Sequence, residues 1–225
     1  MAGLLQVLFT LAYPFVVWLA FTRLETRAVG GLLLGLYGVS VLLRARGSRD
    51  EIIALARQHA PIVLLVLIAM LSGNRTLLLL VPMVLSLFLL WTFASSLRHG
   101  PPMIERFARI IEDDLPDFCL PYCRKVTKLW CLFLLANAIC VGGLALFASL
   151  EWWTLYAGFV FYLLLAALLG IETLVRKIWF RYYSNSPFDR GFARLFPPER
   201  SANGRRSLAY VAERVRREEI IRTPS

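Results

Sequence analysis

Histidine and cysteine are scarce in this chain, which has only two and four of them. No second Cys/His pair accompanies Cys119 and Cys123, and the histidines are His59 and His99. A structural zinc site takes four such ligands, so the sequence predicts no metal and no cofactor. The two thiols are expected to be reduced in a cytoplasmic loop. A metal or redox role for this pair is the alternative.

Signatures of enzymes and of nucleic-acid binding are missing as well. The chain has no Gly-rich phosphate loop, serine nucleophile elbow or His-Glu-x-x-His motif. A His-x4-Asp acyltransferase motif would need an aspartate at position 104, where the chain has Ile104. No zinc finger, helix-turn-helix or ribonucleoprotein motif is present, so no nucleic-acid partner is predicted. Charges within the apolar stretches are few, which argues against an ion channel or a proton-coupled transporter.

Apolar residues, by contrast, make up 58% of the chain and fall into long runs. A bilayer core of ~30 Å needs ~20 apolar residues as a helix, and four of the six runs qualify outright. The third run is shorter, and the alternative is that it forms a re-entrant segment instead of a span. Because backbone groups in lipid must be satisfied internally, we predict an all-α polytopic membrane protein with six transmembrane helices. The six runs are Leu4–Phe21, Ala28–Leu43, Pro61–Ser72, Leu77–Leu97, Leu129–Leu150 and Trp153–Val175.

Positive charge lies almost entirely on one side of these runs. Segments 44–60, 98–128 and 176–225 hold 22 of the 25 Lys and Arg residues. The positive-inside rule therefore predicts cytoplasmic N- and C-termini. Five spans would divide the cations 20 to 5, so six spans fit the rule better. The net charge of +10 is expected to attract anionic lipid headgroups.

The predicted organisation has four parts. A four-helix membrane half occupies residues 1–97, and an amphipathic cytoplasmic loop occupies residues 98–128. A two-helix membrane hairpin follows over residues 129–175, and a basic cytoplasmic tail completes the chain over residues 176–225. Within the tail, a terminal helix is predicted over 207–221, capped by Ser207. This helix could dock on the loop helix, on a partner or on the membrane.

The cytoplasmic loop contains the densest set of ionisable groups. Apolar residues at positions 104, 107, 108, 111 and 115 follow one helical face, and Pro116 ends the predicted helix. Such a helix is expected to lie along the inner membrane surface. Its carboxylates could bind a divalent cation while its arginines bind a phosphate, or Glu105 and Arg109 could form an ordinary i,i+4 pair on a solvated face. The candidate catalytic residues are Glu105, Arg106, Arg109 and Asp114.

A second set of cations could bind a partner or anionic lipid. Glu172 stands four residues before Arg176, which predicts an ion pair on one helix face. Asn137, inside the fifth apolar run, is expected to hydrogen-bond to a neighbouring helix. The candidate binding residues are Arg106, Arg109, Arg124, Lys125, Arg176 and Lys177.

Several of these residues resemble those of a known group of proteins. Gly100–Arg109, Asp114-Leu-Pro, Tyr122–Trp130 and Asn137 are similar to a group of small uncharacterised bacterial integral membrane proteins. Trp152-Trp153-x-x-Tyr156 and Glu172-x-x-x-Arg176 resemble the same group. Its genes lie among those for aryl polyene pigments, including the xanthomonadin type. The resemblance, strongest over residues 100–176, implies a Gram-negative inner membrane protein that works with ketosynthases, carrier proteins and acyltransferases. It supplies no catalytic mechanism.

Three functional hypotheses follow from these features. In the first, the protein is a non-catalytic membrane component of pigment and lipid biosynthesis. Its basic inner face would recruit an acyl carrier protein or a pathway enzyme and help to hand over a polyene chain. In the second, it is a membrane enzyme that acts on a lipid-linked substrate. In the third, it is a transporter or flippase of the finished lipid. We favour the first hypothesis.

Overall fold

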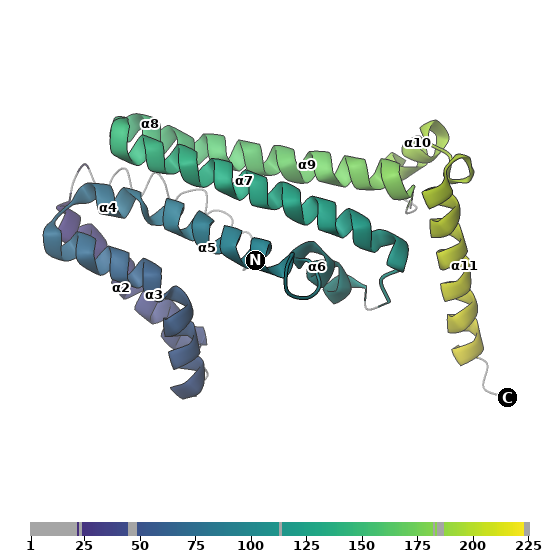
Figure 1. Cartoon of the computed structure of the whole chain (residues 1–225), viewed down its shortest axis with the longest axis horizontal. Helices are drawn as coiled ribbons and strands as arrows, with labels where there is room; N and C mark the ends of the chain where they lie inside the picture. Colours follow the sequence, from purple (N-terminus) through teal and green to yellow (C-terminus); the bar gives the residue numbers. More distant parts are fainter. Residues whose placement is uncertain are drawn as a thin grey trace. The chain divides into compact units, whose positions relative to one another are not determined.

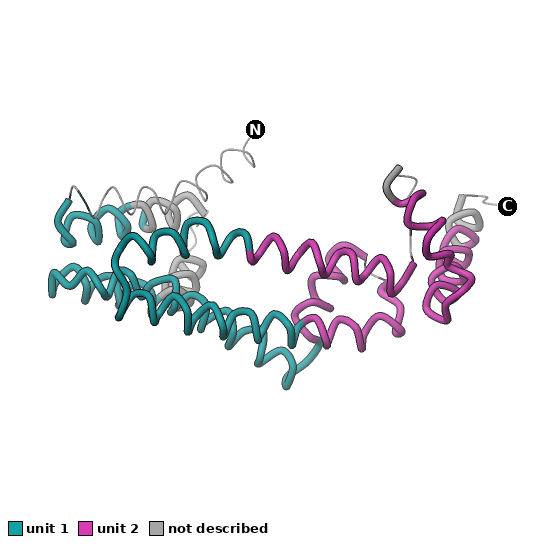
Figure 2. Tube along the Cα trace, turned by 90° about the horizontal axis from the view of Figure 1, so that it is seen from above, with its two compact units in different colours: residues 1–101, 127–163 teal, residues 102–126, 164–225 magenta. Residues whose placement is uncertain are grey.

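The computed structural model describes residues 24–44, 49–112, 114–181 and 187–222, together with residues 22 and 183. These residues form helices and connecting segments without a strand, which confirms the all-α class (Figure 1). The chain divides into two compact units (Figure 2). Unit 1 comprises Met1–Pro101 and Thr127–Leu163, and unit 2 comprises Pro102–Val126 and Leu164–Ser225.

Two long helices belong to both units, α7 (Leu120–Phe147) and α9 (Phe161–Phe180). The other helices of unit 1 are α2 (Thr26–Arg44), α3 (Arg49–Ser72), α4 (Arg75–Leu79), α5 (Val81–Ser96), α8 (Leu150–Leu155) and the π-helix η2 (Tyr156–Val160). The other helices of unit 2 are α6 (Met103–Ile111), the 3-10 turns η1 (Asp117–Cys119) and η3 (Pro198–Arg200), α10 (Pro187–Leu195) and α11 (Ala202–Arg222).

Three segments of the described chain are long and apolar enough to cross a membrane. They are Arg75–Ser96, Asp117–Phe147 and Leu150–Phe180, which correspond to the fourth, fifth and sixth predicted spans. The first predicted span lies outside the described residues, and the second forms α2. The third corresponds to Ile62–Ser72, the apolar end of α3. This apolar segment is too short to cross a bilayer. The count of six spans is therefore not confirmed.

In unit 1, α2 and α3 pack closely around small residues. Val29, Val66, Ala69 and Leu78 form a buried cluster. A Cβ atom added at Gly30 would lie 3.1 Å from the Met70 Cβ, so the glycine lets the helices approach. Close approach through small residues is the usual way in which membrane helices pack.

The helix break between α4 and α5 is stabilised by a tryptophan. Pro82 stands in the first turn of α5, where a missing N–H is tolerated. Trp153 is 1% exposed and packs with Leu79, Val141 and Ala145. Its Nε1 donates to the carbonyl of Leu79 at 3.2 Å. The indole therefore fills the core and also satisfies a backbone acceptor at the break.

Segment 98–128, which was predicted to be a cytoplasmic loop, is shorter as a loop and more helical than its sequence suggests. The helix α6 ends at Ile111 because Glu112 is extended (φ −140°, ψ 98°), so Leu115 lies beyond it and Pro116 is not its terminator. The helix α7 already begins at Leu120, which makes residues 120–128 part of a long helix and not of a loop. Glu112 is bound by side chains of α11, a tertiary contact that periodicity cannot reveal.

Candidate functional site

Unit 2 contains a cavity of about 420 Å³, within the size range of small-molecule sites. Its walls come from α6, the segment that follows it, the start of α7, the end of α9, α10 and α11. The apolar part of the lining includes Ile104, Ala108, Ile111, Leu115, Phe118 and Phe180. Polar and charged side chains complete it, so the cavity is amphipathic.

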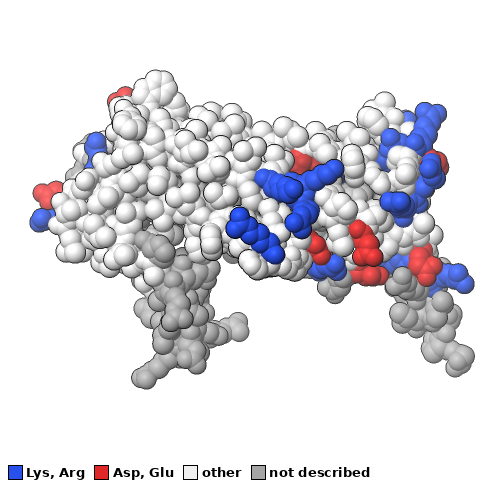
Figure 3. Space-filling view, in the orientation of Figure 1, with Lys and Arg blue, Asp and Glu red and all other residues white. Residues whose placement is uncertain are grey.

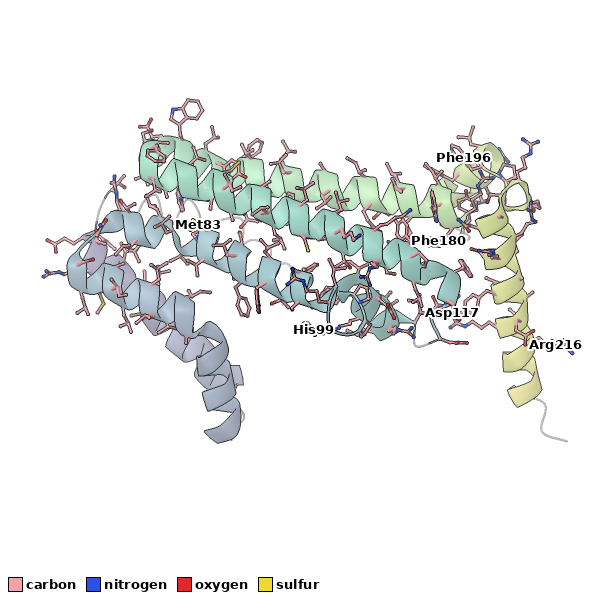
Figure 4. The ribbon with its side chains drawn as sticks, in the orientation of Figure 1. Met83, His99, Asp117, Phe180, Phe196 and Arg216 are labelled. Atoms are coloured by element: carbon pink, nitrogen blue, oxygen red, sulfur yellow. The ribbon has the colours of Figure 1, made fainter. Side chains whose placement is uncertain are left out.

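An aromatic cluster joins the start of α7 to the end of α9. The Phe180 ring, labelled in Figure 4, lies 5.9 Å from the ring of Phe118 and 5.0 Å from that of Tyr122. The second pair meets edge to face, a favourable arrangement for aromatic rings. These rings form a rigid apolar wall beside the charged groups of the cavity.

The charged part of the cavity is built around Glu172. Its carboxylate accepts a hydrogen bond from the Tyr122 hydroxyl at 3.2 Å. The Arg176 Nε lies 3.7 Å from the same oxygen, which confirms the predicted i,i+4 ion pair. The Arg176 side chain is 55% exposed, and this contact is longer than a hydrogen bond. The guanidinium, which has five N–H donors, can therefore also bind an anionic group at the cavity.

A second ion pair holds α10 against α9. Lys177 Nζ contacts the Asp189 carboxylate, whose side chain is 4% exposed. A carboxylate that is buried this deeply needs a cation beside it. The pair thus fixes one wall of the cavity. Arg181, just beyond α9, donates to the Pro197 carbonyl at 2.7 Å and supports the same wall.

The helix α11 covers one side of the cavity through Ser207 and Tyr210. The Tyr210 hydroxyl shares its one proton between the Asp114 carbonyl at 2.6 Å and the Glu112 carboxylate at 3.2 Å. Arg214 pairs with the same carboxylate at 2.6 Å. Burial and the neighbouring negative charge of Glu112 raise the pKa of Tyr210, so its hydroxyl keeps the proton that it donates.

The candidate catalytic residues do not line this cavity. Glu105 is 7% exposed and pairs with Arg109 at 2.9 Å, so the ordinary i,i+4 pair is present, with its carboxylate buried and its Arg109 side chain 41% exposed. Arg106 is exposed on α6, and Asp114 offers its carbonyl to Tyr210. The structure therefore does not bring these four residues together into one site.

The predicted binding cations are distributed over unit 2. Arg176 and Lys177 line the cavity. Lys125 Nζ lies 5.7 Å above the Trp179 ring, a cation–π contact between α7 and α9, and Arg124 is exposed beside it. On the face drawn in Figure 3, further Lys and Arg side chains gather around α10 and α11, with acidic side chains among them.

Sequence reasoning missed the tyrosines and Asp189 as cavity residues. Tyr122 was part of the family resemblance but carried no role, and Tyr210 lay in the predicted terminal helix. That helix is present as α11 but begins at Ala202, so Ser207 is a buried helical residue and not its cap. Asp189 follows Pro187 in the first turn of α10, a common place for an acidic side chain.

The cysteines of the cavity are free thiols. Cys119, at the end of η1, and Cys123, in the first turn of α7, both line it. In the described part of the chain, no group of three or more His, Cys, Asp or Glu residues could hold a metal ion.

Unit 1 contains a separate polar cluster between its apolar helices. The Asn137 amide donates to the Ser86 hydroxyl at 2.8 Å and accepts from the Tyr156 hydroxyl at 3.0 Å. The prediction that Asn137 bonds a neighbouring helix is therefore confirmed. Ser86 in turn donates to the Pro82 carbonyl. Tyr156 begins the π-helix η2, so this network links α5, α7 and the irregular start of the last long helix.

Together, fold and cavity define a class: an all-helical protein with helices that fit a membrane and an amphipathic cavity in its second unit. The chain matches no protein-family model, no curated protein and no solved structure.

Proposed function

We propose that this protein is a non-catalytic component of the bacterial inner membrane that holds a long-chain, lipid-like molecule in the cavity of unit 2. The observation that carries this proposal is the lining of that cavity. Apolar and aromatic walls suit a hydrocarbon or polyene chain, and Arg176 suits an acidic head. The protein would thus keep an apolar intermediate out of water and hand it to the next enzyme.

Helix lengths support a position at the cytoplasmic membrane surface. Two apolar segments have 31 residues each, about 46 Å of helix against a bilayer core of ~30 Å. Their charged ends begin at Lys128 and Glu172 and continue into unit 2. If the apolar stretches between these charges and the break at Ala148 and Ser149 fill the core, the cavity lies in the headgroup layer. The positive-inside rule then places this side in the cytoplasm.

The separation of the cavity from Glu105, the acidic residue of α6, favours a binding protein over an enzyme. Glu105 is buried in its pair with Arg109 and is not among the cavity residues. A general acid or base must come within hydrogen-bond reach of the reacting group. The carboxylates that do line the cavity, those of Glu112, Glu172 and Asp189, are each paired with a cation. Nothing in the described residues specifically favours a flippase.

The resemblance of residues 100–176 to proteins of aryl polyene gene clusters supplies the biological context of this proposal. In that context the ligand is a polyene acyl chain or its lipid product. An acidic acyl carrier protein would meet the exposed cations of unit 2, where charge complementarity chiefly accelerates encounter.

The proposal is tested by mass spectrometry of envelope lipids from the native host, comparing wild type, a deletion and complemented strains. We expect deletion to remove polyene lipid and to accumulate an intermediate. Wild-type complementation and Ala167→Trp, an exposed position outside the cavity, should restore the lipid, whereas Ala108→Trp, which fills the cavity, should not. An unchanged lipid profile in the deletion strain would reject the pathway, and full rescue by Ala108→Trp would reject the cavity.

A further inference from the structure

The helix α6 turns its apolar residues away from the protein. Phe107, Ile110 and Ile111 are 44%, 78% and 87% exposed, and their i, i+3, i+4 spacing places them on one face. Glu105, toward the other side of the helix, is 7% exposed. On the surface of a soluble protein the arrangement is the reverse, with the apolar face inside and the charged face in solvent.

The side of α6 that faces the protein carries the buried carboxylate of an ion pair. The buried carboxylate of Glu105 is matched by Arg109, whose Nε and a terminal nitrogen lie 3.0 and 2.9 Å from it. Ala108 lines the cavity wall next to them. The Glu105 side chain is 9% exposed and that of Arg109 is 41% exposed, so turning α6 over would move the buried carboxylate into solvent. The outward apolar face is therefore a property of the folded unit.

We propose that this face inserts into the lipid bilayer at the boundary between headgroups and acyl chains, with anionic lipid as its partner. Within unit 2 the exposed surface of α9 includes three apolar side chains, those of Ile171, Leu174 and Val175, as expected for contact with lipid. Lys125 above the Trp179 ring is a pairing typical of the headgroup level. Arg106 is exposed next to the apolar face and supplies positive charge for anionic headgroups.

Insertion of α6 also places one wall of the cavity beside lipid. Ile111 is both the most exposed of the three apolar residues and a lining residue of the cavity. An amphiphile would then enter sideways from the inner leaflet and not from the cytoplasm. This route rests on the proposed function, whereas the insertion of α6 does not.

The proposal is tested by photo-crosslinking in the full chain, purified into nanodiscs that contain phosphatidylglycerol and phosphatidylcholine. A benzophenone amino acid replaces Ile110 in one variant and Ala212, exposed on the polar helix α11, in the control. We expect lipid adducts at position 110, several times more abundant than at position 212. Arg106→Gln should reduce the phosphatidylglycerol share of these adducts.

Two outcomes would overturn the proposal: equal adduct yields at positions 110 and 212, or crosslinks from position 110 to a second copy of the chain. Because the bulky probe could disturb folding, a second measurement uses a small dye on Ile110→Cys, read in a chain that lacks the native cysteines. Spin-labelled lipid should quench this dye and leave a dye on Ala212→Cys unaffected. Absence of quenching at position 110 would also reject insertion.

If α6 inserts but Ala108→Trp rescues lipid production, the ligand hypothesis fails and the membrane contact stands.

Discussion

Removal of the Glu112 carboxylate should open the cavity by releasing α11. Glu112 follows α6, and its carboxylate accepts a hydrogen bond from Tyr210 and pairs with Arg214, both of α11. The change Glu112→Ala deletes one hydrogen bond and one ion pair. It leaves the hydrogen bond from Tyr210 to the Asp114 carbonyl in place. We therefore expect partial release of α11 and not its complete loss.

The size of the effect follows from the exposure of the two contacts. The Arg214 and Glu112 side chains are 54% and 36% exposed, so water and salt weaken their attraction to about 0.2–1 kcal/mol. The hydrogen bond from Tyr210 adds about 0.5–1.5 kcal/mol. A total of about 1–2 kcal/mol corresponds to a rise of roughly 5- to 30-fold in the population of the open state.

Cys123 provides the assay because it lines the cavity and is 5% exposed. In a chain whose other cysteines are replaced, the rate of maleimide labelling reports the open population when closing is faster than labelling. Glu199→Ala is the matched control, since Glu199 contacts Arg205 of α11 through its backbone carbonyl. Labelling of Cys123 should accelerate in Glu112→Ala alone. Equal rates in the two variants would refute the role assigned to α11.

Three further predictions concern packing and titration. Replacing Asn137 by leucine removes its hydrogen bonds to Ser86 and Tyr156 and should destabilise the protein by about 0.6–2 kcal/mol in detergent unfolding, a cost typical of such bonds in membranes. Gly204→Ala should destabilise unit 2 strongly and lower the melting temperature, because the added Cβ would lie 2.2 Å from the rigid Pro198 carbonyl. Gly142→Ala is the control. Its Cβ would lie 2.5 Å from the flexible Met83 Sδ, so it should shift the melting temperature much less. The Tyr210 hydroxyl should titrate above the ordinary value of about 10, and its stabilising effect should persist below that pH and disappear as the pH rises through the raised pKa. Absorbance at high pH, compared between wild type and Tyr210→Phe, measures this shift.

Local signals in the sequence predicted much of the fold. The apolar runs indicated the long helices, and the spacing of apolar residues over 104–111 indicated α6. Both signals lie within one segment of the chain and so can be read from the sequence. Positions of helix ends were harder to predict. Residues 120–128 are rich in cations and were assigned to a loop, yet they continue α7 for more than two turns.

The cavity could be predicted only in part. Arg176 and Glu172 are four residues apart, so one helix predicts their contact. Tyr210 and Glu112 are 98 residues apart, and only the tertiary structure brings them together. The face of α6 was predicted as amphipathic, but its orientation depends on which side unit 2 covers. For this reason Glu105, which sequence reasoning placed on a solvated face, is buried.

The central claim, that the cavity of unit 2 holds a long-chain amphiphile, is tested most directly by photoaffinity labelling of the purified protein. A long-chain fatty acid that carries a diazirine serves as the probe, and mass spectrometry locates its adducts. We predict adducts concentrated between residues 104 and 123 and between residues 172 and 180, lost in Ala108→Trp and retained in Ala167→Trp. Adducts spread evenly over the exposed apolar helices, with the same yield in both variants, would contradict the account.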